Sequence, residues 1–299
     1  MREIWLCAKW NLRAIFKSPR MIMCEVMGFL LCFLLTDFSI TLSHRYQTSL
    51  QAFEPFIWCY ADGDSILYAS LVLMLLLTGV PRLDTAASYF IFRIDRGGWL
   101  LGQVLTILIV TLCYCLFLLL STMLLGIGQI YFSNHWSDTA VLLSFSDQRF
   151  QTAVSVVRKT VKLTLPFQSV VNIFFLLFQY VLFVSLLQLA LTIWKNKKIG
   201  ILAAICLHAY GYLLTPDRFM AWLSLDETHQ YIANLLAAWL SPLQHATYIM
   251  HNFGYDKLPR LWTSHALLGA LSLILLAAAY IRMRKFNFQF AGGSINGDQ

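Results

Sequence analysis

The chain has 299 residues, of which 59% are hydrophobic and 12% are charged, and its mean hydropathy is +0.65. This composition excludes an ordinary soluble domain, because several apolar runs reach the roughly 20 residues that cross a bilayer. The net charge of +7 comes from short basic clusters beside those runs, which is typical of cytoplasmic membrane loops and excludes a nucleic-acid-binding surface.

The first segment, residues 1–20, favours an amphipathic helix lying on the membrane surface. On an ideal helix its basic residues share one sector and most of its apolar residues share another, which is the pattern of an interfacial helix facing anionic lipid. Pro19 ends this helix before the first span. The residues that carry the pattern are Trp5, Lys9, Arg13, Phe16 and Lys17. We expect the helix to face a soluble partner; a plain membrane anchor is the alternative.

Six apolar runs follow, each near or above the crossing length. Only helices or closed barrels satisfy backbone hydrogen bonds in lipid, and these runs do not alternate with period two, so they predict helices. No linker divides the chain, and residues 1–299 are expected to form a single transmembrane domain of an all-α polytopic membrane protein. The predicted spans cover residues 21–40, 64–81, 99–128, 169–194, 199–216 and 262–282.

The distribution of basic residues predicts the orientation. An even number of spans places both termini on one side, which collects 14 Lys and Arg residues against 8 on the other. The positive-inside rule therefore predicts cytoplasmic termini, although four bases between positions 149 and 162 weaken the bias. We expect a multi-pass protein of a bacterial cytoplasmic membrane.

Between the second and third spans, residues 82–98 form a charged segment predicted to lie in the cytoplasm. We expect a short helix across the membrane face, because Gly97 and Gly98 allow a sharp turn into the third span. Its aromatic rings would anchor in a partner while its charges form a rim. The residues of this predicted contact are Tyr89, Phe90, Phe92, Arg93, Asp95 and Arg96. An ordinary basic loop is the alternative.

The predicted outer loop between the third and fourth spans covers residues 129–168. Over residues 146–167 of this loop, Phe150, Val154, Val157 and Val161 follow helical spacing, which predicts an amphipathic helix on the outer membrane surface. A lid over the pathway exit, or a docking site for an anionic substrate, is the alternative use.

The outer loop before the last span, residues 217–261, contains an apolar stretch at 231–250 that Pro242 interrupts. We expect a broken helix that dips into the membrane from the outer side, because a full crossing would place the basic C-terminal end outside. A seventh span is the alternative.

Some polar side chains fall inside the predicted spans, where they are costly and often functional. Glu25 and Asp37 lie near the ends of the first span, and Asn172, Gln179 and Gln188 lie loosely along one face of the fourth. These five residues are candidates for the transport pathway. Contacts at the membrane interface for the acids, and hydrogen bonding between helices for the amides, are the alternatives.

Catalytic and cofactor motifs do not appear in the sequence. There is no G-x-x-x-x-G-K-[ST] phosphate loop, no H-E-x-x-H and no G-x-S-x-G, and the seven cysteines have no metal-ligand spacing. His208, His245, His251 and His265 are scattered singly. We therefore predict a non-catalytic chain with no catalytic residue and no metal site.

Taken together, this layout resembles the membrane subunit of an ABC exporter of the ABC-2 type. The matching pieces are the basic N-terminal helix ending in Lys17-Ser18-Pro19-Arg20, the charged loop before a long third span, the six spans and the interrupted segment before the last span. The loop at 129–168 is longer than in the family's compact members.

The resemblance implies a permease that pairs with a second permease subunit, as a homodimer or a heterodimer. In that family the N-terminal helix and the first cytoplasmic loop contact a separate ATPase subunit, which binds ATP and Mg. Phe90, Arg93, Asp95 and Arg96 would then be coupling residues. An ion-coupled secondary transporter and a stand-alone immunity or scaffold protein are the alternatives.

Overall fold

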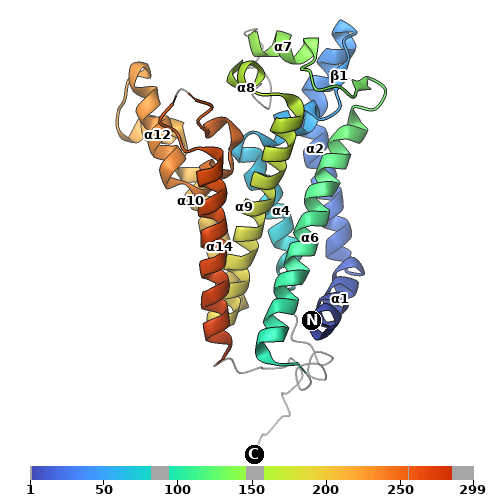
Figure 1. The fold of residues 1–299 in the computed structure, drawn as a ribbon, viewed down its shortest axis with the longest axis vertical. Helices are drawn as coiled ribbons and strands as arrows, with labels where there is room; N and C mark the ends of the chain where they lie inside the picture. The colour runs from blue at the N-terminus through green and yellow to red at the C-terminus, as the bar shows by residue number, and fades with distance from the viewer. Residues whose placement is uncertain (1, 82–93, 146–157, 255, 285–299) are drawn as a thin grey trace, which may run out of the picture.

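The computed structural model describes residues 2–81, 94–145, 158–254 and 256–284. Long helices run side by side between two ends of the molecule (Figure 1). One end carries α1 and is called the α1 end below; the other carries β1, α7, α8 and α12 and is called the β1 end. The elements in chain order are α1 (Arg2–Phe16), α2 (Pro19–Tyr46), β1 (Leu50–Gln51), α3 (Glu54–Tyr60), α4 (Gly63–Leu77), α6 (Arg96–Leu125), β2 (Ile130–Tyr131), α7 (Asp138–Phe145), α8 (Arg158–Leu163), α9 (Pro166–Trp194), α10 (Lys197–Leu213), α11 (Pro216–Trp222), η2 (Glu227–His229), α12 (Gln230–Leu240), α13 (Pro242–Ala246), η3 (Tyr248–Met250) and α14 (Leu261–Met283).

Among the described residues, four helices are long and apolar enough to cross a membrane: α2, α6, α9 and α14. Two further candidates are bent pairs, α3 with α4 at 88° and α10 with α11 at 68°. The chain is therefore a mostly helical protein with four to six candidate spans. The count of six and the side on which the termini lie stay predictions.

Local sequence explains where these helices begin. Proline occupies the first turn of α2, α9, α11 and α13, where its missing N–H costs no hydrogen bond. Side-chain oxygens cap three other helices: Asp62 accepts from Asp64 N at the start of α4, and Asn196 accepts from Ile199 N at the start of α10. Asp95 does the same for α6.

Helix α9 is the centre of the bundle. It contacts α14, α10, α6 and α4, and Leu176, Leu177 and Tyr180 on it are fully buried. In its most apolar stretch 56% of the residues are buried, against 22% in α2 and 17% in α14. Helices α2 and α14 therefore turn most of their apolar side chains outward, as membrane-facing helices do.

The predicted interruption at 231–250 is confirmed. Helix α12 ends at Leu240, Ser241 is extended, and Pro242 begins the short helix α13, where the Ser241 hydroxyl accepts from Gln244 N. Helix α12 lies at the β1 end, while α13 contacts α4, α9 and α14 within the bundle (Figure 1). Whether this stretch re-enters the membrane stays a prediction.

The β1 end holds structure that the sequence analysis did not predict. Helix α3 and helix α7 fall in stretches treated as plain connections, and β1 pairs in parallel with β2 in the register Leu50 with Ile130. Of the amphipathic helix predicted over 146–167, residues 146–157 lie outside the described residues; the rest forms α8 and the first turn of α9.

Candidate functional site

Helix α1 packs against the first turns of α6 at the α1 end (Figure 1). The approach is close because Gly102 has no side chain: a Cβ there would lie 2.8 Å from Cys7 Sγ. One turn further on, buried Asn11 donates a hydrogen bond from Nδ2 to Thr106 Oγ1 at 3.4 Å. A small-residue contact and a polar contact thus fix α1 on α6.

This packing corrects one detail of the predicted surface helix. Its predicted apolar sector is divided: Ala8 and Ile15 are buried in the protein, while Trp5 and Phe16 stay about half exposed. The sector of the helix surface next to these two rings carries exposed basic side chains, Lys9, Arg13 and Lys17. Helix α1 therefore presents an aromatic and basic face that points away from the bundle.

The start of α6 lies beside the end of α14. Asp95 caps α6 by accepting from Gly98 N at 3.0 Å, so its carboxylate has a structural role in addition to the predicted contact role. Arg96 Nη1 donates to the carbonyl oxygen of Arg284, just after α14. The other predicted coupling residues lie outside the described residues, and their role stays a prediction: Tyr89, Phe90, Phe92 and Arg93.

The predicted pathway residues do not meet at one point. Glu25 and Asp37 are exposed on α2. Along α9, Asn172 is half-buried, Gln179 bonds His265 Nδ1 through Oε1 at 2.8 Å, and Gln188 is buried. These three amides extend over about 24 Å of helix. Helix-to-helix bonding accounts for Gln179, and a pathway role for the set stays a prediction.

Two histidines that looked isolated in the sequence share one hydroxyl near the start of α14. Ser264 Oγ lies 2.9 Å from His245 Nδ1 and 2.9 Å from His251 Nε2, and all three residues are buried. His251 Nδ1 faces the carbonyl oxygen of Tyr248 at 3.2 Å, so this nitrogen carries the proton. The sequence spacing, in which these histidines are scattered singly, does not predict that the two meet at one hydroxyl.

This assignment determines which atoms of the cluster donate and which accept. If His251 donates from Nδ1, its Nε2 accepts the proton of the Ser264 hydroxyl, and His245 Nδ1 must donate to Ser264 Oγ. His245 Nε2 is left as a buried acceptor without a partner among the described residues. Burial, as the largest cause, lowers the pKa of His251 to about 4; His245 and His265 contribute to the lowering, and hydrogen bonds to the backbone of Tyr248 and Thr247 oppose it. The imidazole of His251 is therefore uncharged near pH 7.

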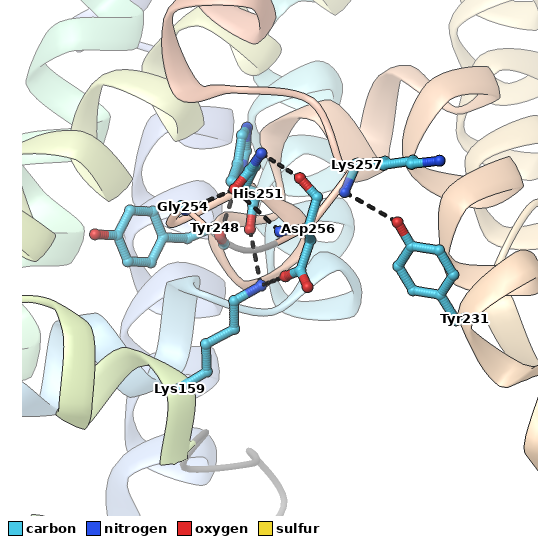
Figure 2. A network of polar contacts seen from close by, with 8 residues as sticks. Lys159, Tyr231, Tyr248, His251, Gly254, Asp256 and Lys257 are labelled. Carbon is cyan, nitrogen blue, oxygen red and sulfur yellow. Dashed lines mark hydrogen bonds and ion pairs between the residues drawn. The ribbon is translucent and has the colours of Figure 1, made fainter.

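A latch at the β1 end holds the connection before α14 against α8. Lys159 Nζ donates to the carbonyl oxygen of His251 at 3.1 Å and pairs with the carboxylate of Asp256 (Figure 2). On the other side of the connection, Lys257 N donates to the hydroxyl of Tyr231 on α12 at 2.9 Å. The latch therefore joins three segments distant in sequence: α8, the connection 251–260 and α12.

One carboxylate is completely buried at the β1 end. Glu54, at the start of α3, accepts from Ser137 N at 2.7 Å, from Ser137 Oγ at 2.6 Å and from Gln51 N at 3.3 Å. Three donors satisfy the carboxylate and tie α3 to the segment before α7. This geometry makes Glu54 a structural tie between two connections.

Sequence reasoning missed these clusters because their members have no shared spacing. His245, His251 and Ser264 come from three different segments, and Glu54 and Ser137 are separated by two long helices. Within the described part of the chain, no group of three or more His, Cys, Asp or Glu side chains is placed to hold a metal ion. No protein-family model and no curated protein matches the sequence.

Proposed function

We propose that this chain is the membrane-spanning permease subunit of an ATP-driven exporter of the ABC-2 type. A separate ATPase subunit would dock at the α1 end, on the cytoplasmic side of the membrane. A second permease subunit would complete the substrate pathway, and ATP and Mg would be bound by the ATPase. Conformational change in the ATPase would move residues 82–98 and, through them, α4 and α6.

The observation that carries the proposal is the arrangement at the α1 end. Helix α1 is fixed on the first turns of α6 through Gly102 and Asn11, and its aromatic and basic face points outward. The connection between α4 and α6 begins and ends at this same end (Figure 1). A partner bound there would contact both α1, which packs on α6, and the connection that leads into α6. Movement of that partner would therefore be transmitted directly to α6.

The placement of the acidic residues argues against an ion-coupled transporter. Such a protein needs carboxylates inside the bundle near mid-membrane, where coupling ions or protons bind. Glu25 and Asp37 are exposed on α2, and buried Glu54 already accepts three hydrogen bonds at the β1 end. Glu25 and Asp37, being exposed, lack the buried surroundings of a coupling site.

Purification of the tagged chain from its native membrane tests the proposal. We expect a soluble protein with a phosphate-binding loop to co-purify and the complex to hydrolyse ATP. Replacement of both Phe90 and Arg93 with Ala should reduce the recovered ATPase about tenfold or more, because aromatic and Arg anchors dominate interface energies. The permease itself should still insert.

A matched control replaces an aromatic and an Arg at the opposite end, Phe132→Ala with Arg45→Ala, both exposed. This variant should retain the ATPase fully. Recovery of the wild-type chain without any nucleotide-binding partner would contradict the proposal. So would full complex formation and full ATPase activity in the Phe90 and Arg93 double variant.

A further inference from the structure

A cavity of about 310 Å³ lies at the α1 end where α1 meets α2. Its walls come from the α1–α2 junction and from the end of α4, and the lining residues are Ile15, Ser18, Pro19, Arg20, Leu76 and Gly79. The volume is within the range of small-ligand sites. Gly79 leaves room in it, because a Cβ there would make ordinary contact with Arg20 Nη1 at 3.4 Å.

An apolar groove of about 70 Å³ continues from this cavity between α2 and α4. The two hollows share Arg20 and Leu76. Buried Cys24 and Val72 form the floor of the groove, while Met23, Met27 and Leu75 form exposed walls. From Arg20 to Met27 the groove follows seven residues of α2, or about 10 Å along the helix axis.

Arg20, which is exposed, lines both hollows. Lys197, at the start of α10, is a second exposed cation near Arg20, and it lines neither hollow. Among the described residues, Arg20 makes one long hydrogen bond, from Nη1 to Thr78 Oγ1 at 3.4 Å. A guanidinium has five N–H donors, so most of its donors remain for an anion. Glu25 is not among the side chains that line either hollow.

We propose that this junction binds an anionic phospholipid from the leaflet on the α1 side. The lipid phosphate lies in the cavity, where Arg20 donates to it in the two-pronged manner of guanidinium–phosphate pairs and Lys197 adds charge. One acyl chain lies in the groove over Cys24 and Val72. The combination of a cationic cavity with a continuous apolar groove selects a lipid over a free anion. The bound lipid contacts α2 and α4 at this end and offsets part of the repulsion between the two cations.

Native mass spectrometry of the purified full-length chain tests the site, with equal amounts of phosphatidylglycerol and phosphatidylcholine added in detergent. We expect the wild-type chain to retain phosphatidylglycerol preferentially. Replacing both Arg20 and Lys197 with Gln should weaken that binding by roughly 25-fold, about fivefold for each cation. The matched control, Lys9→Gln with Arg13→Gln on α1, removes the same charge from the same end and should retain the lipid.

Two further measurements separate a specific site from general charge attraction and from misfolding. Gly79→Leu fills the cavity without changing the charge, and it should weaken phosphatidylglycerol binding as well. A large molar excess of inorganic phosphate should leave the lipid bound, because phosphate cannot occupy the groove. Equal binding of the two lipids by the wild-type chain, unchanged binding in the Arg20 and Lys197 variant or in Gly79→Leu, or complete displacement by phosphate would each overturn the proposal.

Discussion

Removal of the Ser264 hydroxyl tests the histidine cluster at the β1 end. Ser264→Ala leaves His251 Nε2 without its donor and His245 Nδ1 without its acceptor, and both histidines are buried. Each unpaired buried group costs about 1–3 kcal/mol, so the free energy of unfolding should fall by about 2–6 kcal/mol. At about 2–4 °C for each kcal/mol, the unfolding midpoint should fall by at least about 4 °C.

The assay is thermal unfolding of the purified chain in detergent, followed by loss of the monodisperse species in size-exclusion chromatography. Thr263→Ala is the matched control, because this neighbouring side chain is only half-buried and donates a solvent-exposed hydrogen bond to the carbonyl oxygen of Arg260. The control should change the midpoint by less than about 2 °C, because water can replace this bond. Equal midpoints for Ser264→Ala and the wild-type chain would refute the hydrogen-bond assignment.

Three other predictions concern both ends of the molecule. Gly102→Leu should force α1 off α6, because the Cβ alone would lie 2.8 Å from Cys7, and tryptic cleavage at Lys9 should then become faster. The control is Gly269→Leu on α14, where an added Cβ has no atom within 4 Å, and it should leave the cleavage rate unchanged. The pKa of His251 is about 4 in the folded chain and about 6.5 in the unfolded chain. Above pH 6.5, His251 therefore makes its full contribution to the free energy of unfolding. That contribution is lost as the pH falls from 6.5 toward 4, so the unfolding midpoint should fall over this interval and fall less steeply in His251→Asn. An impermeant maleimide added to intact cells should label His135→Cys at the β1 end and not Lys17→Cys at the α1 end, with Cys113 and Cys206 replaced by Ala; the reverse pattern would contradict the orientation.

The apolar runs made the long helices predictable. Runs such as 99–128 and 169–194 are strongly apolar, and their helical form follows from the backbone's need for hydrogen bonds in lipid. The break at Pro242 was also predictable, because proline cannot continue a helix without losing a hydrogen bond. These are local properties that a single stretch of sequence contains.

The details of packing could not be predicted in the same way. Helix α1 has one broad apolar sector, and only its partner α6 decides that Ala8 and Ile15 in it are buried while Trp5 and Phe16 remain exposed. The Ser264 cluster depends on three segments meeting, which no periodicity records. The short helices α3 and α7 carry too few residues to produce a clear periodic pattern.

The most direct test of the account is photo-crosslinking in living cells from position 13 on the outward face of α1, with position 135 at the β1 end as the control. We predict an adduct from position 13 to a cytoplasmic protein that carries a phosphate-binding loop, and no such adduct from position 135. An adduct to that ATPase from position 135, or none from position 13 while the chain is active in the membrane, would contradict it.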